Sequence, residues 1–163
     1  MKIIRLAATI AITIVLTTHA SAHGFTASTI EIVHPFFRET PPGAKTGAGY
    51  VILRNTGEAA DRLMGIETEA AAKVTFHRSV TENDMVKMVP IEGGLEIPAG
   101  EEYRLGLDGS HAMLEELTAP IGLGQVIEGT LIFEKAGRIA ITFEVEPIGT
   151  TQEDAMSGHE NGH

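Results

Sequence analysis

The 163-residue sequence contains no cysteine. Disulfide bonds and thiolate metal sites are therefore excluded, so a soft metal ion can be held only by imidazole and thioether groups. Tryptophan is also absent and aromatic residues make up only 5% of the chain, so any core must be mainly aliphatic. The stability of the fold has to come from this ordinary core and not from covalent cross-links.

Basic residues are few. The chain has 12 Lys and Arg residues against 22 Asp and Glu residues, a formal net charge of −10. Nucleic acid and anionic lipid both require a basic patch, so we expect neither as a partner. The acidic balance suits a cation or a basic protein partner, although it would also serve solubility alone.

Long hydrophobic runs are limited to one, over residues 6–16. Lys2 and Arg5 precede it, and small residues follow it up to Ala22, which is the pattern of a secretory signal. The run is shorter than the roughly 20 residues that a membrane span needs. We therefore predict a cleaved signal peptide over residues 1–22, an exported protein, and no membrane span in the mature chain.

The remainder reads as short segments of alternating or apolar residues separated by Gly, Pro and Asn turn signals. This pattern is typical of an all-β sandwich or barrel. Residues 67–73 alone have helical composition, and they are too few for an α/β unit. The expected strands cover residues 29–33, 49–54, 73–77, 85–89, 102–107, 110–114, 126–133 and 138–145, with a shorter one between Gly94 and Pro98.

The expected domain organisation is simple. Residues 23–148 are long enough for one domain with a single core, and no internal repeat divides them. From Gly149 the sequence turns polar and loses its periodicity. We predict a flexible tail over residues 149–163.

Four residues of this domain could together bind a metal ion: His77, Met88, His111 and Met113. In a strand, residues two apart point to the same face, so His111 and Met113 can offer a ring nitrogen and a thioether sulfur to one ion. His77 and Met88 lie near the ends of two predicted strands that can pair across the Glu82-Asn83-Asp84 turn. The four side chains are therefore candidates for one site.

This donor set selects the metal. Thioether sulfur is soft and uncharged, which suits Cu(I) and competes poorly for hard cations, and imidazole is accepted by copper and zinc alike. Zinc would usually recruit cysteine or a carboxylate. A site with two sulfurs, two imidazoles and no carboxylate therefore predicts Cu(I).

Each of these residues, taken alone, also has an ordinary explanation, because methionine commonly fills cores and histidine commonly lies at surfaces. We assign Met64 and Met85 to such structural roles. Met85, on the strand face opposite Met88, remains an alternative ligand.

The chain resembles the PCu(A)C family of periplasmic copper chaperones over about residues 30–146. The resemblance begins with the segment His34 to Tyr50, which reads HPFFRETPPGAKTGAGY. It continues through Asn55-Thr56-Gly57, Asp61-Arg62-Leu63, His77, Met88-Val89-Pro90, Gly94 to Gly100, and Phe133-Glu134-Lys135-Ala136-Gly137.

The copper motif of that family is His, ten residues, Met, twenty-one residues, then His-x-Met. Here ten residues separate His77 from Met88, as in the family, and twenty-two separate Met88 from His111. We expect the additional residue in the turn at 107–109, where insertions are tolerated. The pairing register that delivers His111 and Met113 depends on that turn.

The resemblance implies a cupredoxin-like or immunoglobulin-like Greek-key β-sandwich. It also implies a periplasmic carrier that passes Cu(I) towards the CuA centre of cytochrome c oxidase, with a Sco-type thiol protein as a further partner. An enzyme is not expected, because no spacing suggests a Ser/His/Asp triad or a pair of catalytic carboxylates.

The two ends of the mature chain suggest an alternative function, a periplasmic Cu(II)-binding resistance or buffering protein. Cleavage after Ala22 makes His23 the amino terminus, where its α-amine and ring can chelate Cu(II) together. Imidazole and carboxylate groups of the tail also suit the divalent ion. The secondary metal candidates are His23, Met156, His159 and His163. A copper enzyme built on His23 would need a second histidine, for which His34 is the candidate.

Overall fold

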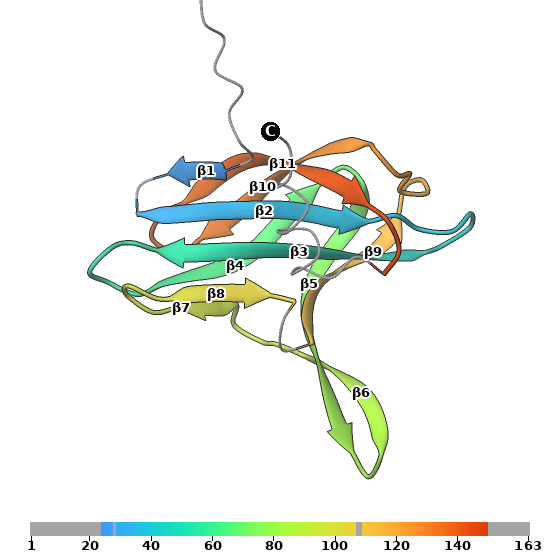
Figure 1. The fold of residues 1–163 in the computed structure, drawn as a ribbon, viewed down its shortest axis with the longest axis horizontal. Coiled ribbons are helices and arrows are strands. Elements are labelled where there is room, and N and C mark those ends of the chain that lie inside the picture. The colour runs from blue at the N-terminus through green and yellow to red at the C-terminus, as the bar shows by residue number, and fades with distance from the viewer. Residues whose placement is uncertain (1–23, 28, 107–108, 150–163) are drawn as a thin grey trace, which may run out of the picture.

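The chain forms an all-β sandwich in a computed structural model that describes residues 24–27, 29–106 and 109–149 (Figure 1). No helix in these ranges is long and apolar enough to span a bilayer. The strands of the described ranges are β1 (Gly24–Ala27), β2 (Ile30–Arg38), β3 (Thr46–Asn55), β4 (Asp61–Thr68), β5 (Ala71–Glu82), β6 (Met85–Pro90), β7 (Leu95–Ile97), β8 (Glu102–Leu105), β9 (Ser110–Leu117), β10 (Val126–Phe133) and β11 (Arg138–Glu146).

The strands follow the order β6-β5-β9-β3-β2-β11-β10-β4-β7, with β1 paired to β2 and β8 paired to β3. Most neighbours along this path are distant in sequence, and β2 pairs in parallel with β11 near the end of the chain. In Figure 1, β4 and β10 run behind β2 and β3. The predicted cupredoxin-like or immunoglobulin-like Greek-key sandwich is confirmed.

Alternation along the strands places one face of each in the core. On β9, for example, Ala112 and Leu114 are fully buried while their neighbours His111 and Met113 are only partly buried. The core is mainly aliphatic, as the scarcity of aromatic residues predicted. The core thereby holds the backbone of β9 in place while its alternate side chains remain available at the surface.

Two stacked phenylalanines fix the centre of the core between two glycines. The rings of Phe37 on β2 and Phe143 on β11 lie 4.1 Å apart at an angle of 9°. A Cβ atom at Gly49 on β3 would lie 2.8 Å from the Phe37 ring, and one at Gly129 on β10 would lie 2.7 Å from the Phe143 ring. Glycine is needed at both positions because an aromatic ring lies directly over the backbone.

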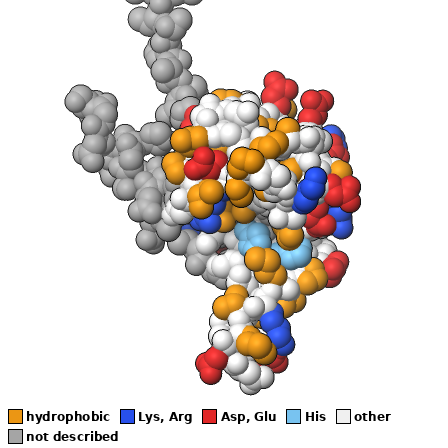
Figure 2. Space-filling model, turned by 90° about the vertical axis from the view of Figure 1, so that its right-hand side faces the viewer, with side chains coloured by type: hydrophobic (Ala, Val, Ile, Leu, Met, Phe, Trp, Pro, Cys, Tyr) orange, Lys and Arg blue, Asp and Glu red, His pale blue; other side chains and the backbone are white. Residues whose placement is uncertain are grey.

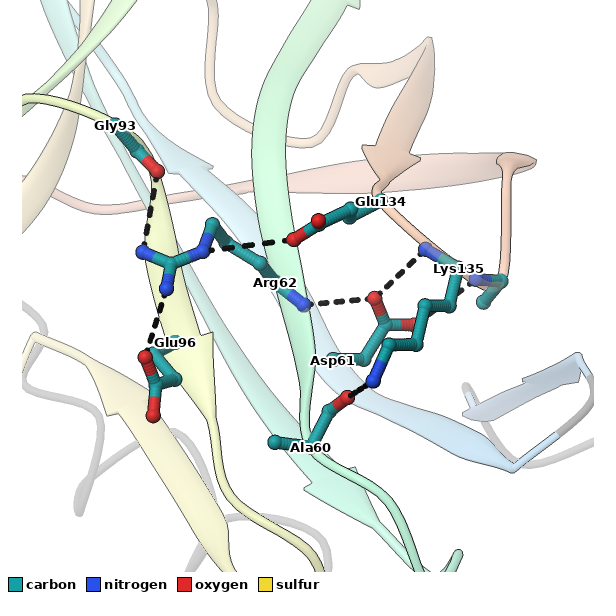
Figure 3. Close-up of polar contacts among 8 residues, drawn as sticks. Ala60, Asp61, Arg62, Gly93, Glu96, Glu134 and Lys135 are labelled. Carbon is teal, nitrogen blue, oxygen red and sulfur yellow. Dashed lines mark hydrogen bonds and ion pairs between the residues drawn. The ribbon is translucent and has the colours of Figure 1, made fainter.

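A buried aspartate connects β4 to the turn that joins β10 to β11. Asp61 is 6% exposed, and its carboxylate accepts backbone hydrogen bonds from Arg62, Lys135 and Ala136 at 2.7, 2.9 and 2.9 Å. Figure 3 shows this cluster together with the Arg62 side chain, which pairs with Glu96 at 2.7 Å. Two segments of the family resemblance therefore meet in space, in a structural role.

The sequence prediction missed two strands, β1 and β4. Residues 67–73, whose composition is helical, form the end of β4, a tight turn and the start of β5. β4 lacks a regular period of two because its pairing with β10 shifts register between Ile132 and Phe133, and only Asp61, Leu63 and Ile66 of β4 are buried. A register shift of this kind hides a strand from a search for strict alternation.

The outer half of β5 and the whole of β6 form a hairpin that projects from the body of the sandwich (Figure 1). The predicted pairing across residues 82–84 is confirmed, because Glu82 lies opposite Met85. Asn83 and Asp84 both have positive φ angles, 52° and 58°, as a two-residue hairpin turn requires. Every residue of β6 is exposed.

Candidate metal centre

All four predicted donors lie on one face of the sheet formed by β6, β5 and β9. His77 on β5 is directly opposite His111 on β9, and Met113 is opposite Thr75, two residues before His77. Met88 on β6 is opposite Ser79, two residues after His77. Directly opposed residues share a face, as do residues two apart, so the register brings the four side chains together.

The register of β5 against β9 determines how His111 and Met113 are presented, which the sequence alone left dependent on the turn at 107–109. Pairing runs without a shift from Arg78 opposite Ser110 to Ala71 opposite Leu117. The strand that carries His111 and Met113 therefore pairs regularly with β5. The predicted place of the insertion, residues 107–109, lies partly outside the described residues.

The two imidazole rings are neighbours, with centroids 6.1 Å apart and ring planes at 31°. Figure 2 shows histidine side chains side by side between the body and the hairpin, with apolar side chains around them. β5 pairs with β9 along its inner half and with β6 along its outer half, and His77 is paired on both sides, with His111 and with Pro90. His77 thus marks the junction of body and hairpin.

Hydrogen bonds fix which nitrogen of His77 carries a lone pair. The Thr75 hydroxyl donates to Glu115 Oε1 at 2.6 Å, so its oxygen accepts from His77 Nε2 at 3.0 Å. His77 Nδ1 is then unprotonated in the neutral ring. It is buried and has no hydrogen-bond partner among the described residues. A buried acceptor of this kind is normally satisfied, and a metal ion would satisfy it.

His111 has the complementary arrangement. Its Nδ1 donates to the carbonyl oxygen of Gly109 at 3.3 Å, which leaves Nε2 with the lone pair. Burial lowers the pKa of His111, and the proximity of His77 and of the Arg38 guanidinium lowers it further, against an opposing contribution from the Gly109 hydrogen bond. The ring is therefore kept in its neutral, metal-binding form.

The two methionines line a surface pocket of about 320 Å³ with His111. Met88 is 61% exposed, whereas Met113 is partly buried. Met85 lies opposite Glu82, on the other face of the hairpin, as its position in the sequence predicted. The site thus has one donor on the projecting hairpin, one at the junction and two on the body.

The arrangement does not suit a hard cation. Within the described ranges no group of three or more His, Cys, Asp or Glu side chains is placed to hold a metal ion. The candidate donors that share this face are two imidazoles and two thioethers, all uncharged. Such a set favours a soft monovalent ion.

Three supporting residues were not predicted from the sequence. Thr75 and Glu115 orient His77, and each lies two residues from a donor on the same strand face, which is a signal that could have found them. Arg38, at the end of β2, lines the pocket with Met88, His111 and Met113. No local pattern links Arg38 to these donors, because β2 reaches them only through the fold.

The secondary candidates His23, Met156, His159 and His163 lie outside the described residues. His34, the candidate second histidine of a copper enzyme, is 7% exposed on β2, and its Nε2 lies 2.7 Å from Glu146 Oε1 on β11. It adopts a positive φ of 48° at an irregularity in the pairing of β2 with β3. His34 is thus already engaged, in a buried contact away from the four donors.

Comparison with known proteins gives consistent matches. Residues 30–145 match the family described as "Putative lipoprotein LpqE-like". The chain is 31% identical over 119 residues to "Putative lipoprotein Lxx21020" of Leifsonia xyli subsp. xyli (strain CTCB07), covering 73% of this chain and 68% of that protein.

Two solved structures share the fold at similar identity. The copper-bound PCuAC domain from PmoF2 is 26% identical with a TM-score of 0.65, over 77% of this chain and 98% of that chain. The solution structure of CuI-DR1885 from Deinococcus radiodurans is 25% identical with a TM-score of 0.55, over 78% of this chain and 83% of that chain.

Proposed function

This chain belongs to the LpqE-like family and has the fold of PCuAC domains, and from that premise we propose that it is a copper carrier that binds Cu(I) through His77, Met88, His111 and Met113. The similar structures from PmoF2 and DR1885 are copper-bound and CuI-bound respectively. The same ion is the one that two neutral imidazoles and two thioethers prefer.

The observation that carries the proposal is the state of His77. Thr75 and Glu115 hold its Nε2 as a hydrogen-bond donor, which leaves a buried nitrogen acceptor, Nδ1, directed to no described partner. The opposed ring of His111 is kept neutral. Two imidazole lone pairs are thereby available on a surface that also presents two sulfur atoms.

The site favours transfer over catalysis. Met88 is exposed on the hairpin, so an incoming ligand can replace its sulfur first and then displace the remaining neutral donors in turn. We propose on this basis that the protein is not an enzyme, and that it works in the periplasm and delivers Cu(I) towards the CuA centre of cytochrome c oxidase. A Sco-type protein would be a further partner, and cleavage of residues 1–22 would precede this work.

X-ray absorption on the Cu(I)-loaded protein tests the ligand set. We expect two sulfur and two nitrogen scatterers at one copper ion per chain. A first shell of three or more nitrogens without sulfur would contradict the proposal. The Met85→Leu protein is the matched control, and its spectrum should be unchanged because Met85 lies on the opposite face of the hairpin.

One observation favours a second function, Cu(II) buffering through the chain ends. Ile148 lines the same pocket as Met88, His111 and Met113, and its backbone N–H is fixed by Glu39 Oε1 at 3.1 Å. The described region thus ends beside the proposed site, and Met156, His159 and His163 follow later in the sequence.

Electron paramagnetic resonance of Cu(II)-loaded protein separates the two modes. For end-chain binding, the Cu(II) signal survives replacement of the four donors and is lost when residues 150–163 are deleted or a residue is added before His23. A signal that disappears with the four donors alone would refute this second function.

A further inference from the structure

Arg38 places a fixed positive charge in the pocket of the neutral donors. It is the last residue of β2, is partly buried, and lines the pocket with Met88, His111 and Met113. Its guanidinium carbon lies 4.5 Å from the centre of the Tyr50 ring on β3. This cation–π contact, made from a strand in the middle of the sheet, holds the charge where it is.

The charge of Arg38 acts on the groups of the pocket. Arg38 lines the same pocket as Met88, His111 and Met113, so its positive charge lies beside any ion that these donors hold. Arg38 also opposes the burial-induced rise in the pKa of Tyr50. A fixed positive charge in the pocket repels a bound cation, and more so as the charge of that cation increases.

We propose that Arg38 determines the preference of this site for monovalent over divalent copper. The proposal rests on the copper-carrier function above and adds a residue that touches no metal. The four donors carry no charge, so none of them offsets the second positive charge of Cu(II). Glu39 also lines the pocket, and its carboxylate, which accepts a hydrogen bond from the backbone N–H of Ile148, offsets only part of the charge of Arg38.

The expected effect of Arg38 on copper selectivity follows from the single positive charge that it carries. Repulsion between Arg38 and the extra charge of Cu(II), across a partly exposed pocket, corresponds to about a tenfold change in the ratio of Cu(I) to Cu(II) affinity. For a one-electron couple, tenfold is about 59 mV in the reduction potential of the bound ion.

The test uses three kinds of variant of the mature protein. The first removes the charge of Arg38, the second keeps it on another side chain, and the third removes a positive charge far from Arg38 in the sequence. Arg38→Gln and Arg38→Leu should each lower the ratio of Cu(I) to Cu(II) affinity about tenfold and lower the potential accordingly. Arg38→Lys keeps the charge and should restore both. Arg138→Gln removes an equal charge from an exposed pair with Glu67 and should change neither. Methionine is avoided as a replacement because it would add a sulfur donor.

Affinities come from competition with Cu(I)- and Cu(II)-selective chelators, and the potential from direct titration. An unchanged ratio in both neutral variants, with sulfur still bound to Cu(I), would overturn the role of Arg38 and leave the carrier function standing. An equal shift in Arg138→Gln would also overturn it, since net charge alone would then be responsible. If wild-type protein binds Cu(I) without sulfur ligands, the carrier function itself fails, and the role of Arg38 fails with it.

Discussion

Replacing Met88 and Met113 together by leucine is expected to lower the Cu(I) affinity by at least about a hundredfold. Loss of a residue that merely orients a ligand typically costs 10–100-fold, and this variant loses two of the four ligands themselves. Leucine has nearly the volume of methionine, so the strands should remain intact. Competition with a chromophoric Cu(I) chelator measures the effect.

The control for this prediction is Met85→Leu. Met85 is on the same strand as Met88 and is similarly exposed, at 58% against 61%, but it lies on the opposite face. The Cu(I) affinity of the Met85→Leu protein should equal that of the wild type. If the double variant binds as tightly as the wild type while Met85→Leu binds weakly, Met85 is the ligand and the assignment of Met88 is wrong.

The second large effect is expected in the core, where Gly49→Ala and Gly129→Ala should each destabilise the fold by about 2–3 kcal/mol. Each new methyl group would lie within 2.8 Å of a ring of the Phe37–Phe143 stack. The rings press against each other at 4.1 Å, so neither can move away without displacing the other. A destabilisation of about 2–3 kcal/mol is a large share of the typical total stability of a domain, which is about 5–15 kcal/mol.

Urea denaturation measures these changes, and Gly65→Ala is the matched control. Gly65 is also in a strand, but a Cβ atom there would find its nearest neighbour at 4.0 Å. This variant should be neutral or more stable by about 0.5–1 kcal/mol, because alanine loses less backbone freedom on folding. If Gly65→Ala lowered the free energy of unfolding as much as Gly49→Ala, the explanation through the aromatic stack would be refuted.

The fold class and the family could be predicted from the sequence, and the four candidate donors could be proposed from it. The shared face of His111 and Met113 followed from the strand period alone, because residues two apart in a strand point to the same side. β4 could not be found in this way, because Asp61 is a buried polar residue and the shift at Ile132–Phe133 interrupts the alternation.

The arrangement of the site depended on information that no local pattern contains. That His77 faces His111 follows from the pairing of β5 with β9, which is a long-range register chosen by the whole core. The same pairing brings Thr75 to Glu115, and the path of β2 brings Arg38 to the pocket. Donor types can be recognised in a sequence, whereas the residues that set their protonation and electrostatic surroundings come from other strands.

The projecting hairpin links metal affinity to local mechanical order. β6 is fully exposed and pairs with β5 alone among the described strands, so its place depends on that pairing and not on the core. An ion bound by Met88 on the hairpin and by His111 on the body would act as a cross-link between the hairpin and the body. Ion binding and ordering of the hairpin would then favour each other through one coupling free energy, so a partner that bends the hairpin would weaken the binding of the ion.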